Sequence, residues 1–129
     1  MPTQTEIVLK FLEQCGKGKA DLRDAFHTYF TENTIWENVG LVTTTGVNEA
    51  LAFIDKSELS AGITHFDADT LSIAVEGNRV LTERVDRLLT SKGEPVVTLR
   101  VMGIFELADG KIAAWRDYFD PSPLKGANV

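Results

Sequence analysis

The chain has 129 residues, with 43% hydrophobic and 25% charged side chains, and this balance predicts a single globular domain over residues 1–129. Its formal net charge of −6 argues against a nucleic-acid partner, because phosphate recognition depends on clustered Lys and Arg side chains. No apolar run is long enough to cross a bilayer and no signal peptide opens the chain, so we expect a cytoplasmic protein without membrane contact.

The chain offers little for metal or thiol chemistry. Cys15 is the only cysteine, which excludes an intrachain disulfide, and its position near the end of a helical pattern predicts a small core side chain. His27 and His65 are far apart in the sequence, without the close ligand pairs typical of zinc sites. We therefore expect neither a metal ion nor another cofactor.

Helical periodicity predicts three helices in the first half of the chain. Apolar side chains at positions 7, 8, 11, 12 and 15 form one stripe of a helix over residues 5–15, which ends at Gly16. Residues 20–31 repeat this pattern and predict a second helix. A third helix is expected over residues 47–57, where apolar side chains again recur at helical spacing.

The segments between these helices differ in character. Residues 34–39 favour an extended strand, in which Trp36 and Asn38 share one face. The threonine-rich residues 43–46 are predicted to form a loop before the third helix, and residues 60–63 to form a joint after it.

From residue 63 onwards we expect only strands, ending near residues 76, 90, 107 and 120. Gly77-Asn78 and Asp109-Gly110 are strong hairpin signals because both pairs tolerate positive φ angles. Pro121 then ends the sheet, since proline cannot donate a ladder hydrogen bond.

This order of elements predicts an α+β fold. Three to four helices would lie on the concave side of a cone-shaped, curved antiparallel or mixed sheet, and such curvature leaves a pocket open at one end. In the third of the four late strands, alternate residues are expected to face inward: Leu99, Val101, Gly103 and Phe105.

The run Thr82–Leu88 combines strand-like alternation with charged residues. Arg84 and Asp86 share one face, while Glu83 and Arg87 share the other. If Arg84 and Asp86 face the core, each charge is costly unless it is paired, which indicates a functional site. The alternative is that this face is simply solvated, a role that Glu83 and Arg87 would fill as well.

A second carboxylate is available in the strand-like run of residues 113–119. Asp117 shares a face of this run with Trp115. Together with Arg84 and Asp86 it forms a candidate acid/base triad of two carboxylates and one guanidinium.

The sequence resembles the limonene-1,2-epoxide hydrolase family in three motifs: Trp36-x-Asn38, Arg84-Val85-Asp86 and Trp115-Arg116-Asp117-Tyr118-Phe119-Asp120. This family lies within the wider group of cone-shaped NTF2-like domains that includes ketosteroid isomerase and the SnoaL-like polyketide cyclases. The likeness runs from about residue 5 to residue 120.

The resemblance implies a one-step hydration of an epoxide without a cofactor. In the family, the aspartate that matches Asp117 takes a proton from water, the aspartate that matches Asp86 protonates the epoxide oxygen, and the arginine that matches Arg84 bridges them. Asn38 matches an asparagine that helps to hold the water. The implied partners are water and a small hydrophobic epoxide, and the implied assembly is a homodimer.

Trp36 departs from the family pattern, which usually has a tyrosine here. An indole N–H can only donate a hydrogen bond, whereas a hydroxyl group can also accept one. Three outcomes stay open: an enzyme with altered water placement, an enzyme for a differently shaped substrate, and a domain that has lost the reaction. Trp36 could equally be a core side chain.

Two other functions compete with epoxide hydration. An isomerase or cyclase of the ketosteroid isomerase or SnoaL type would use one carboxylate base and a separate donor, without an Asp-Arg-Asp bridge. Glu37 is a candidate base, but period two places it on the face opposite Asn38. A binding domain without catalysis could retain the charged network for structural specificity.

Overall fold

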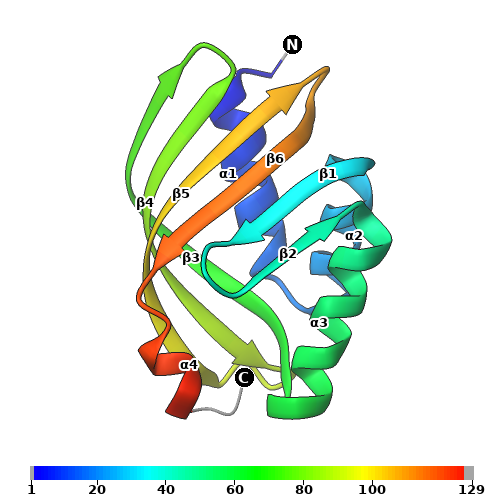
Figure 1. Ribbon diagram of the computed structural model, residues 1–129, viewed down its shortest axis with the longest axis vertical. Helices are drawn as coiled ribbons and strands as arrows, with labels where there is room; N and C mark the ends of the chain where they lie inside the picture. Colours follow the sequence, from blue (N-terminus) through cyan, green and yellow to red (C-terminus); the bar gives the residue numbers. More distant parts are fainter. Residues whose placement is uncertain (1, 127–129) are drawn as a thin grey trace.

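The computed structural model describes residues 2–126, and within them it contains four helices and six strands (Figure 1). The helices are α1 (Gln4–Cys15), α2 (Lys19–Tyr29), α3 (Val47–Ala61) and α4 (Ser122–Gly126). The strands are β1 (Phe30–Asn38), β2 (Val42–Thr45), β3 (Ile63–Glu76), β4 (Arg79–Thr90), β5 (Pro95–Ala108) and β6 (Lys111–Phe119).

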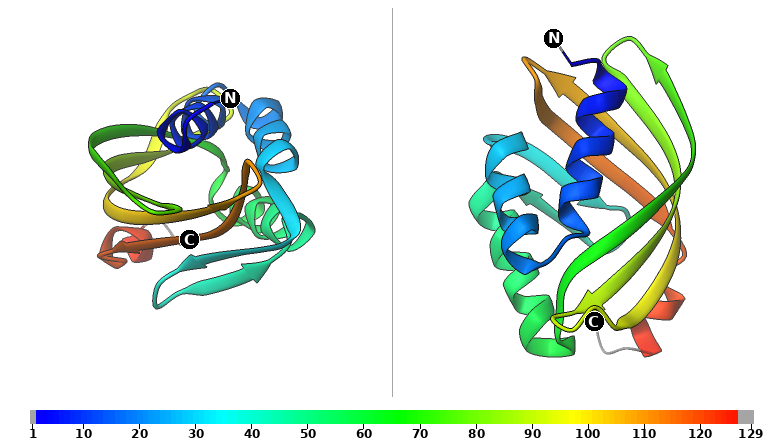
Figure 2. Two further views of the ribbon diagram at one scale, coloured as in Figure 1. Left: turned by 90° about the horizontal axis from the view of Figure 1, so that it is seen from above. Right: turned by 180° about the vertical axis from the view of Figure 1, so that it is seen from behind.

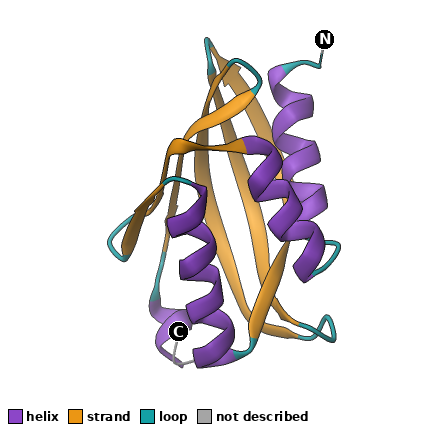
Figure 3. Ribbon diagram, turned by 90° about the vertical axis from the view of Figure 1, so that its right-hand side faces the viewer, coloured by secondary structure: helices purple, strands orange, loops and turns teal. Residues whose placement is uncertain are grey.

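The six strands form one curved sheet in the order β2-β1-β6-β5-β4-β3. Helices α1, α2 and α3 lie against its concave side (Figure 2), and Figure 3 shows the same three helices in front of the strands. The predicted α+β class is therefore confirmed. The sheet is mixed, because β1 runs parallel to β6 while the other neighbours are antiparallel.

Helix α1 forms where the apolar stripe predicts it. A capping box fixes its start, because Thr3 Oγ1 accepts from the backbone N–H of Glu6 and the Glu6 carboxylate accepts from that of Thr3. Its buried residues are the predicted set: Ile7, Val8, Phe11, Leu12 and Cys15. Burial raises the pKa of the Cys15 thiol, so this side chain is a neutral part of the core, as expected.

Two expected boundaries around the first strand are wrong. Helix α2 ends at Tyr29, and Phe30 already has the extended conformation of β1 and pairs with Ile112. Thr34 strengthens this junction, because its hydroxyl donates to the Ile112 carbonyl and accepts from the backbone N–H of Thr31. Pairing with β6 thus outweighs the helical periodicity of the local sequence.

The threonine-rich segment predicted as a loop is strand β2. Its residues pair antiparallel with β1, and Trp36 lies opposite Thr44. Four residues are too few to show a hydrophobic period, whereas β-branched threonines suit a strand once a partner is present. Helix α3 also runs four residues beyond the predicted end, to Ala61, and stops at Gly62, which has a left-handed backbone.

Strands β3 to β6 form the predicted meander, with turns at Gly77-Asn78 and Asp109-Gly110. The last part of the chain was not expected to be helical. After Pro121, however, the short helix α4 places Leu124 against Val97, Leu99 and Val101. Among the residues that the structure describes, no helix is long and apolar enough to span a membrane.

Candidate active site

The inward face of β4 carries charged residues. Thr82, Arg84 and Asp86 alternate along it and are buried, while Arg87 on the other face pairs with Asp67 and Asp69. The structure therefore distinguishes the two faces that periodicity alone left open. The register from β4 through β5 to β6 then brings Asp117 within hydrogen-bonding distance of Arg84.

The Arg84 guanidinium lies between the two carboxylates and uses all five of its N–H groups. Nε donates to Asp86 Oδ1 at 3.0 Å, and Nη2 donates to Asp86 Oδ2 at 2.7 Å and to Asp117 Oδ2 at 2.8 Å. Nη1 donates to Asp117 Oδ1 at 3.1 Å and to Thr82 Oγ1 at 3.0 Å. Every donor of the buried cation thus has an acceptor.

The electrostatics of this cluster follow from its burial. Burial alone would lower the pKa of Arg84, but the charges and hydrogen bonds of Asp117 and Asp86 outweigh it and raise that pKa, so the guanidinium stays protonated. Burial raises the pKa of Asp117, and the Arg84 charge opposes that effect. One cation cannot neutralise two carboxylates, so the cluster carries a net negative charge when both are ionised.

Trp115 and Thr82 are partners of the cluster that were not assigned from the sequence. The Trp115 indole N–H donates to Asp117 Oδ1 at 2.8 Å, and the Thr82 hydroxyl accepts from Arg84 and donates to the Gly103 carbonyl. Strand alternation could have identified both residues in the sequence, because each lies two positions before a charged residue and therefore on the same strand face.

A cavity of about 320 Å³ extends from the two carboxylates, between the sheet and helices α2, α3 and α4. Asp86 and Asp117 line it, whereas Arg84 lies behind them with a fully buried side chain. The wall is mostly apolar and includes Leu22, Phe53, Ile54, Phe66, Leu88, Leu99, Val101 and Phe119. The site therefore combines one small acidic cluster with a large hydrophobic surface.

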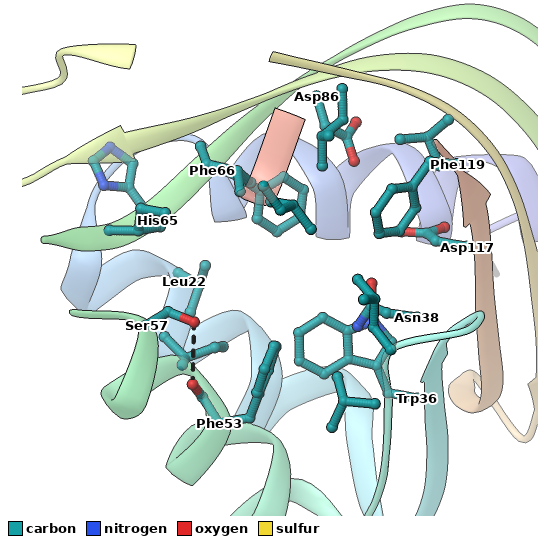
Figure 4. A pocket seen from close by; sticks show the side chains of 18 of the residues that line it. Leu22, Trp36, Asn38, Phe53, Ser57, His65, Phe66, Asp86, Asp117 and Phe119 are labelled. Atoms are coloured by element: carbon teal, nitrogen blue, oxygen red, sulfur yellow. Dashed lines mark hydrogen bonds between the residues drawn. The ribbon is translucent and has the colours of Figure 1, made fainter. Parts of the chain in front are cut away.

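Trp36 and Asn38 also line this cavity. In the parallel pairing of β1 with β6, Asn38 lies beside Asp117 and Trp36 lies beside Trp115. Figure 4 shows Trp36 and Asn38 on the same side of the cavity as Asp117, with His65 on the opposite side. Four of the five candidate site residues thus line the cavity, and the fifth, Arg84, lies behind the two aspartates.

Trp36 belongs to both the core and the cavity wall. Its ring stacks on that of Trp115 with centroids 5.0 Å apart and contacts the ring of Phe53 edge-on. Its indole nitrogen is buried and has no hydrogen-bond partner among residues 2–126. A buried donor of this kind is costly unless a bound molecule supplies an acceptor.

Polar side chains farther from the acid pair bond within the protein. The Ser57 hydroxyl donates to the Phe53 carbonyl, and Thr64 Oγ1 lies 2.8 Å from His65 Nδ1. Glu37 is half-buried and does not line the cavity, in agreement with its expected outward direction. Within residues 2–126, no group of three or more His, Cys, Asp or Glu side chains is placed to hold a metal ion.

The model of the limonene-1,2-epoxide hydrolase catalytic domain matches residues 2–127 of this chain. The chain belongs to the limonene-1,2-epoxide hydrolase family. A curated relative is epoxide hydrolase EphG of Mycobacterium tuberculosis, which is 35% identical over 89 residues, or 69% of this chain. The matched stretch spans 56% of that relative, a little over half of its length.

Solved structures agree with this family and fold. A limonene-1,2-epoxide hydrolase-like epoxide hydrolase of M. tuberculosis superposes with a TM-score of 0.73 at 28% identity, over 95% of this chain and 86% of the other. An NTF2-like protein of unknown function from Burkholderia pseudomallei reaches 0.77 at 18% identity, over 100% and 99% of the two chains. The second likeness concerns the fold alone and confirms the NTF2-like class.

Arg84→Lys tests whether the fork of the guanidinium is needed in this family member. Lysine keeps the charge but has three donors in place of five, so at least two buried hydrogen bonds to the cluster are lost. We expect the free energy of unfolding to fall by about 3 kcal/mol in urea denaturation.

Arg87→Lys is the matched control, since Arg87 lies on the same strand with partly exposed partners, and it should leave the free energy of unfolding nearly unchanged. Equal losses in the two variants would contradict a special role for the Arg84 fork.

Proposed function

We propose that this protein adds water to a small hydrophobic epoxide and releases a vicinal diol, in one step and without a covalent intermediate. The observation that carries this proposal is the position of Asp86 and Asp117 on one guanidinium at the wall of an apolar cavity. Membership of the limonene-1,2-epoxide hydrolase family supports it.

The chemistry of an epoxide explains why two acids are needed. Opening the ring requires a nucleophile at carbon and a proton for the departing oxygen, since an unprotonated alkoxide leaves poorly. Two carboxyl groups in opposite protonation states meet both needs at once. A guanidinium that cannot lose its own proton keeps the pair at that intermediate protonation level.

We assign Asp117 as the base and Asp86 as the acid. Asp117 accepts three hydrogen bonds, two from Arg84 and one from Trp115, and these favour its ionised form. Asp86 accepts two, both from Arg84. Asp117 Oδ2 accepts only one of the three, which leaves it free to take a proton from water.

The proposed step changes two carbon–oxygen bonds and moves two protons. The water oxygen bonds to an epoxide carbon while the carbon–oxygen bond of the ring breaks. A water proton passes to Asp117, and the Asp86 proton passes to the departing oxygen. The diol then leaves with the extra proton on Asp117, and proton exchange with solvent restores the starting state.

Asn38 and Trp36 are proposed to hold the attacking water. The water would donate one proton to Asp117 and the other to the Asn38 carbonyl, and would accept from the unpartnered Trp36 N–H. One lone pair then remains for the epoxide carbon. On this assignment tryptophan replaces the family tyrosine as a donor, and the carboxylate and amide supply both acceptors.

The cavity wall supports a compact hydrocarbon substrate. Away from the acid pair, the hydroxyl of Ser57 and the pair of Thr64 and His65 already bond within the protein. A sugar or nucleotide would leave many polar groups unmatched there. We therefore propose a terpene-like or cyclic epoxide as the substrate type.

The competing functions lack an observation of equal weight. An isomerase would need a carboxylate base apart from its oxyanion donor, and Glu37 does not line the cavity. It would exchange deuterium into a ketone substrate. A binding domain would turn over none of these substrates, although apolar ligands would raise its melting temperature.

The protein should hydrolyse cyclic and aryl epoxides without added metal or cofactor. The wild type should form diol, and Asp117→Asn and Asp86→Asn should each lower kcat by about 10² to 10⁴-fold, as for the loss of a general base or acid. Chromatography of the diol measures this. Asp67→Asn is a matched control on the outer face of the sheet and should retain full turnover. A wild-type rate unchanged in Asp117→Asn would falsify the mechanism.

The value of kcat/KM should depend on pH through the ionisation of Asp117. Since Asp117 must be ionised to act as a base and burial raises its pKa, kcat/KM should fall as the pH drops through that raised value. The inflection should lie above 3.8, the ordinary aspartate value. Asp117→Asn should abolish this limb in its residual activity, whereas a wild-type inflection at or below 3.8 would exclude Asp117 as the group concerned.

The proposed assembly is a homodimer that forms through the outward face of the sheet. Met102 and Tyr118 are paired neighbours on that face and are 53% and 46% exposed, and Ile35 extends the apolar surface onto β1. Light scattering should give twice the mass of one chain, and Met102→Glu should give the mass of one. A monomeric wild type would rule out this assembly.

A further inference from the structure

Strand β5 passes directly between the two strands that carry the acidic cluster. At its centre, Gly103 pairs with Thr82 of β4 on one side and with Asp117 of β6 on the other. Its neighbours on the inward face of β5, Val101 and Phe105, are large and buried. Glycine is thus an isolated gap in an otherwise filled row of side chains.

Backbone conformation does not explain this glycine. Seven glycines of the described chain have a positive φ angle, and Gly103 is not among them. In the interior of a strand, glycine is less stable than alanine, because it loses more conformational freedom on folding. Another requirement must therefore account for the residue.

The requirement for glycine comes from the side-chain atoms that lie directly over Gly103. A Cβ atom at this position would overlap both Asp117 Oδ1 and Arg84 Nη1, and it would lie 3.3 Å from Thr82 Oγ1. The first two atoms form the 3.1 Å hydrogen bond that joins Arg84 to one oxygen of Asp117. That contact thus occupies the volume in which any other residue would place its side chain.

Gly103 also positions Arg84 Nη1 indirectly, through the Thr82 hydroxyl. Its carbonyl accepts from the Thr82 hydroxyl at 3.1 Å, and the same hydroxyl accepts from Arg84 Nη1. The strand therefore fixes Nη1 in two ways, by leaving room for it and by orienting its second acceptor.

We propose that Gly103 is a positioning residue for the proposed hydration, which it serves by letting Arg84 lie flat against Asp117. This inference rests on the function proposed above. Gly103 does not line the cavity, so it acts through the ion pair and not through contact with substrate.

In Gly103→Ala, one added methyl group should affect Asp117 without affecting substrate binding. In Gly103→Ala, Arg84 Nη1 and Asp117 Oδ1 must separate, and the buried carboxylate loses a hydrogen bond that favours its charged form. We expect kcat to fall about 10 to 100-fold with KM nearly unchanged. The acidic limb of kcat/KM should shift to higher pH.

Gly126→Ala is the matched control. For this exposed glycine of α4, no atom of residues 2–126 lies within 4 Å of the position of an added Cβ, and its φ angle is not positive. It should keep the wild-type kcat and pH profile. Circular dichroism and melting temperature establish folding for each variant.

Thr82→Val is the second test and decides the matter if Gly103→Ala does not fold. Valine matches threonine in shape but lacks the hydroxyl that bonds Arg84 and Gly103. It should shift the acidic limb in the same direction by a smaller amount. Wild-type kcat in Gly103→Ala, or a fall in kcat with an unshifted limb, would overturn the proposal, as would an unshifted limb in Thr82→Val.

A measurement independent of turnover separates this inference from the proposed function. The ¹³C shift of the Asp117 carboxyl should titrate at higher pH in Gly103→Ala than in the wild type. If the wild type forms no diol but this displacement is found, the hydration proposal fails while the positioning of the acid pair stands. Identical titrations in the two proteins would overturn the positioning role.

Discussion

The enclosure of the Arg84 guanidinium is the interaction on which the rest of the site depends. A cation with a fully buried side chain is stable only if each N–H group has an acceptor, and here five donors bond two aspartates and one threonine. The acids that stabilise the cation carry one charge too many when both are ionised. Burial raises the pKa of Asp117 in this arrangement, and a proton kept within the acid pair is what the proposed push-pull reaction requires.

Sheet topology brings the residues of the candidate site together around this cluster. The antiparallel run of β4, β5 and β6 brings Arg84 to Asp117 across Gly103, and the parallel pairing of β1 with β6 adds Trp36 and Asn38 beside them. Trp115 links Asp117 to the core, because its ring stacks on those of Trp36 and Phe105 while its N–H donates to Asp117. Asp117 is thus held by a row of stacked aromatic rings, and the cavity in front of it is mostly apolar.

Alternation along strands was enough to place Arg84 and Asp86 on one face and Asp117 on the same face as Trp115, and three motifs were enough to indicate the family. Alternation could not tell which face of β4 is inward, since Glu83 and Arg87 form an equally good charged face, and only packing against the helices decides. Strand β2 was mistaken for a loop because its four residues show no hydrophobic period and take their extended form by pairing with β1. The need for glycine at 103 was not predictable, because it depends on atoms from two neighbouring strands.

The central claim is that water, activated by Asp117, attacks the epoxide directly while Asp86 protonates the leaving oxygen. A single turnover in ¹⁸O-labelled water, with enzyme in excess over epoxide, tests this most directly. Direct attack predicts that all diol from the first turnover carries one labelled oxygen and that the protein carries none. Unlabelled diol from the first turnover, with the label appearing in an aspartate side chain, would show a covalent ester and contradict the account.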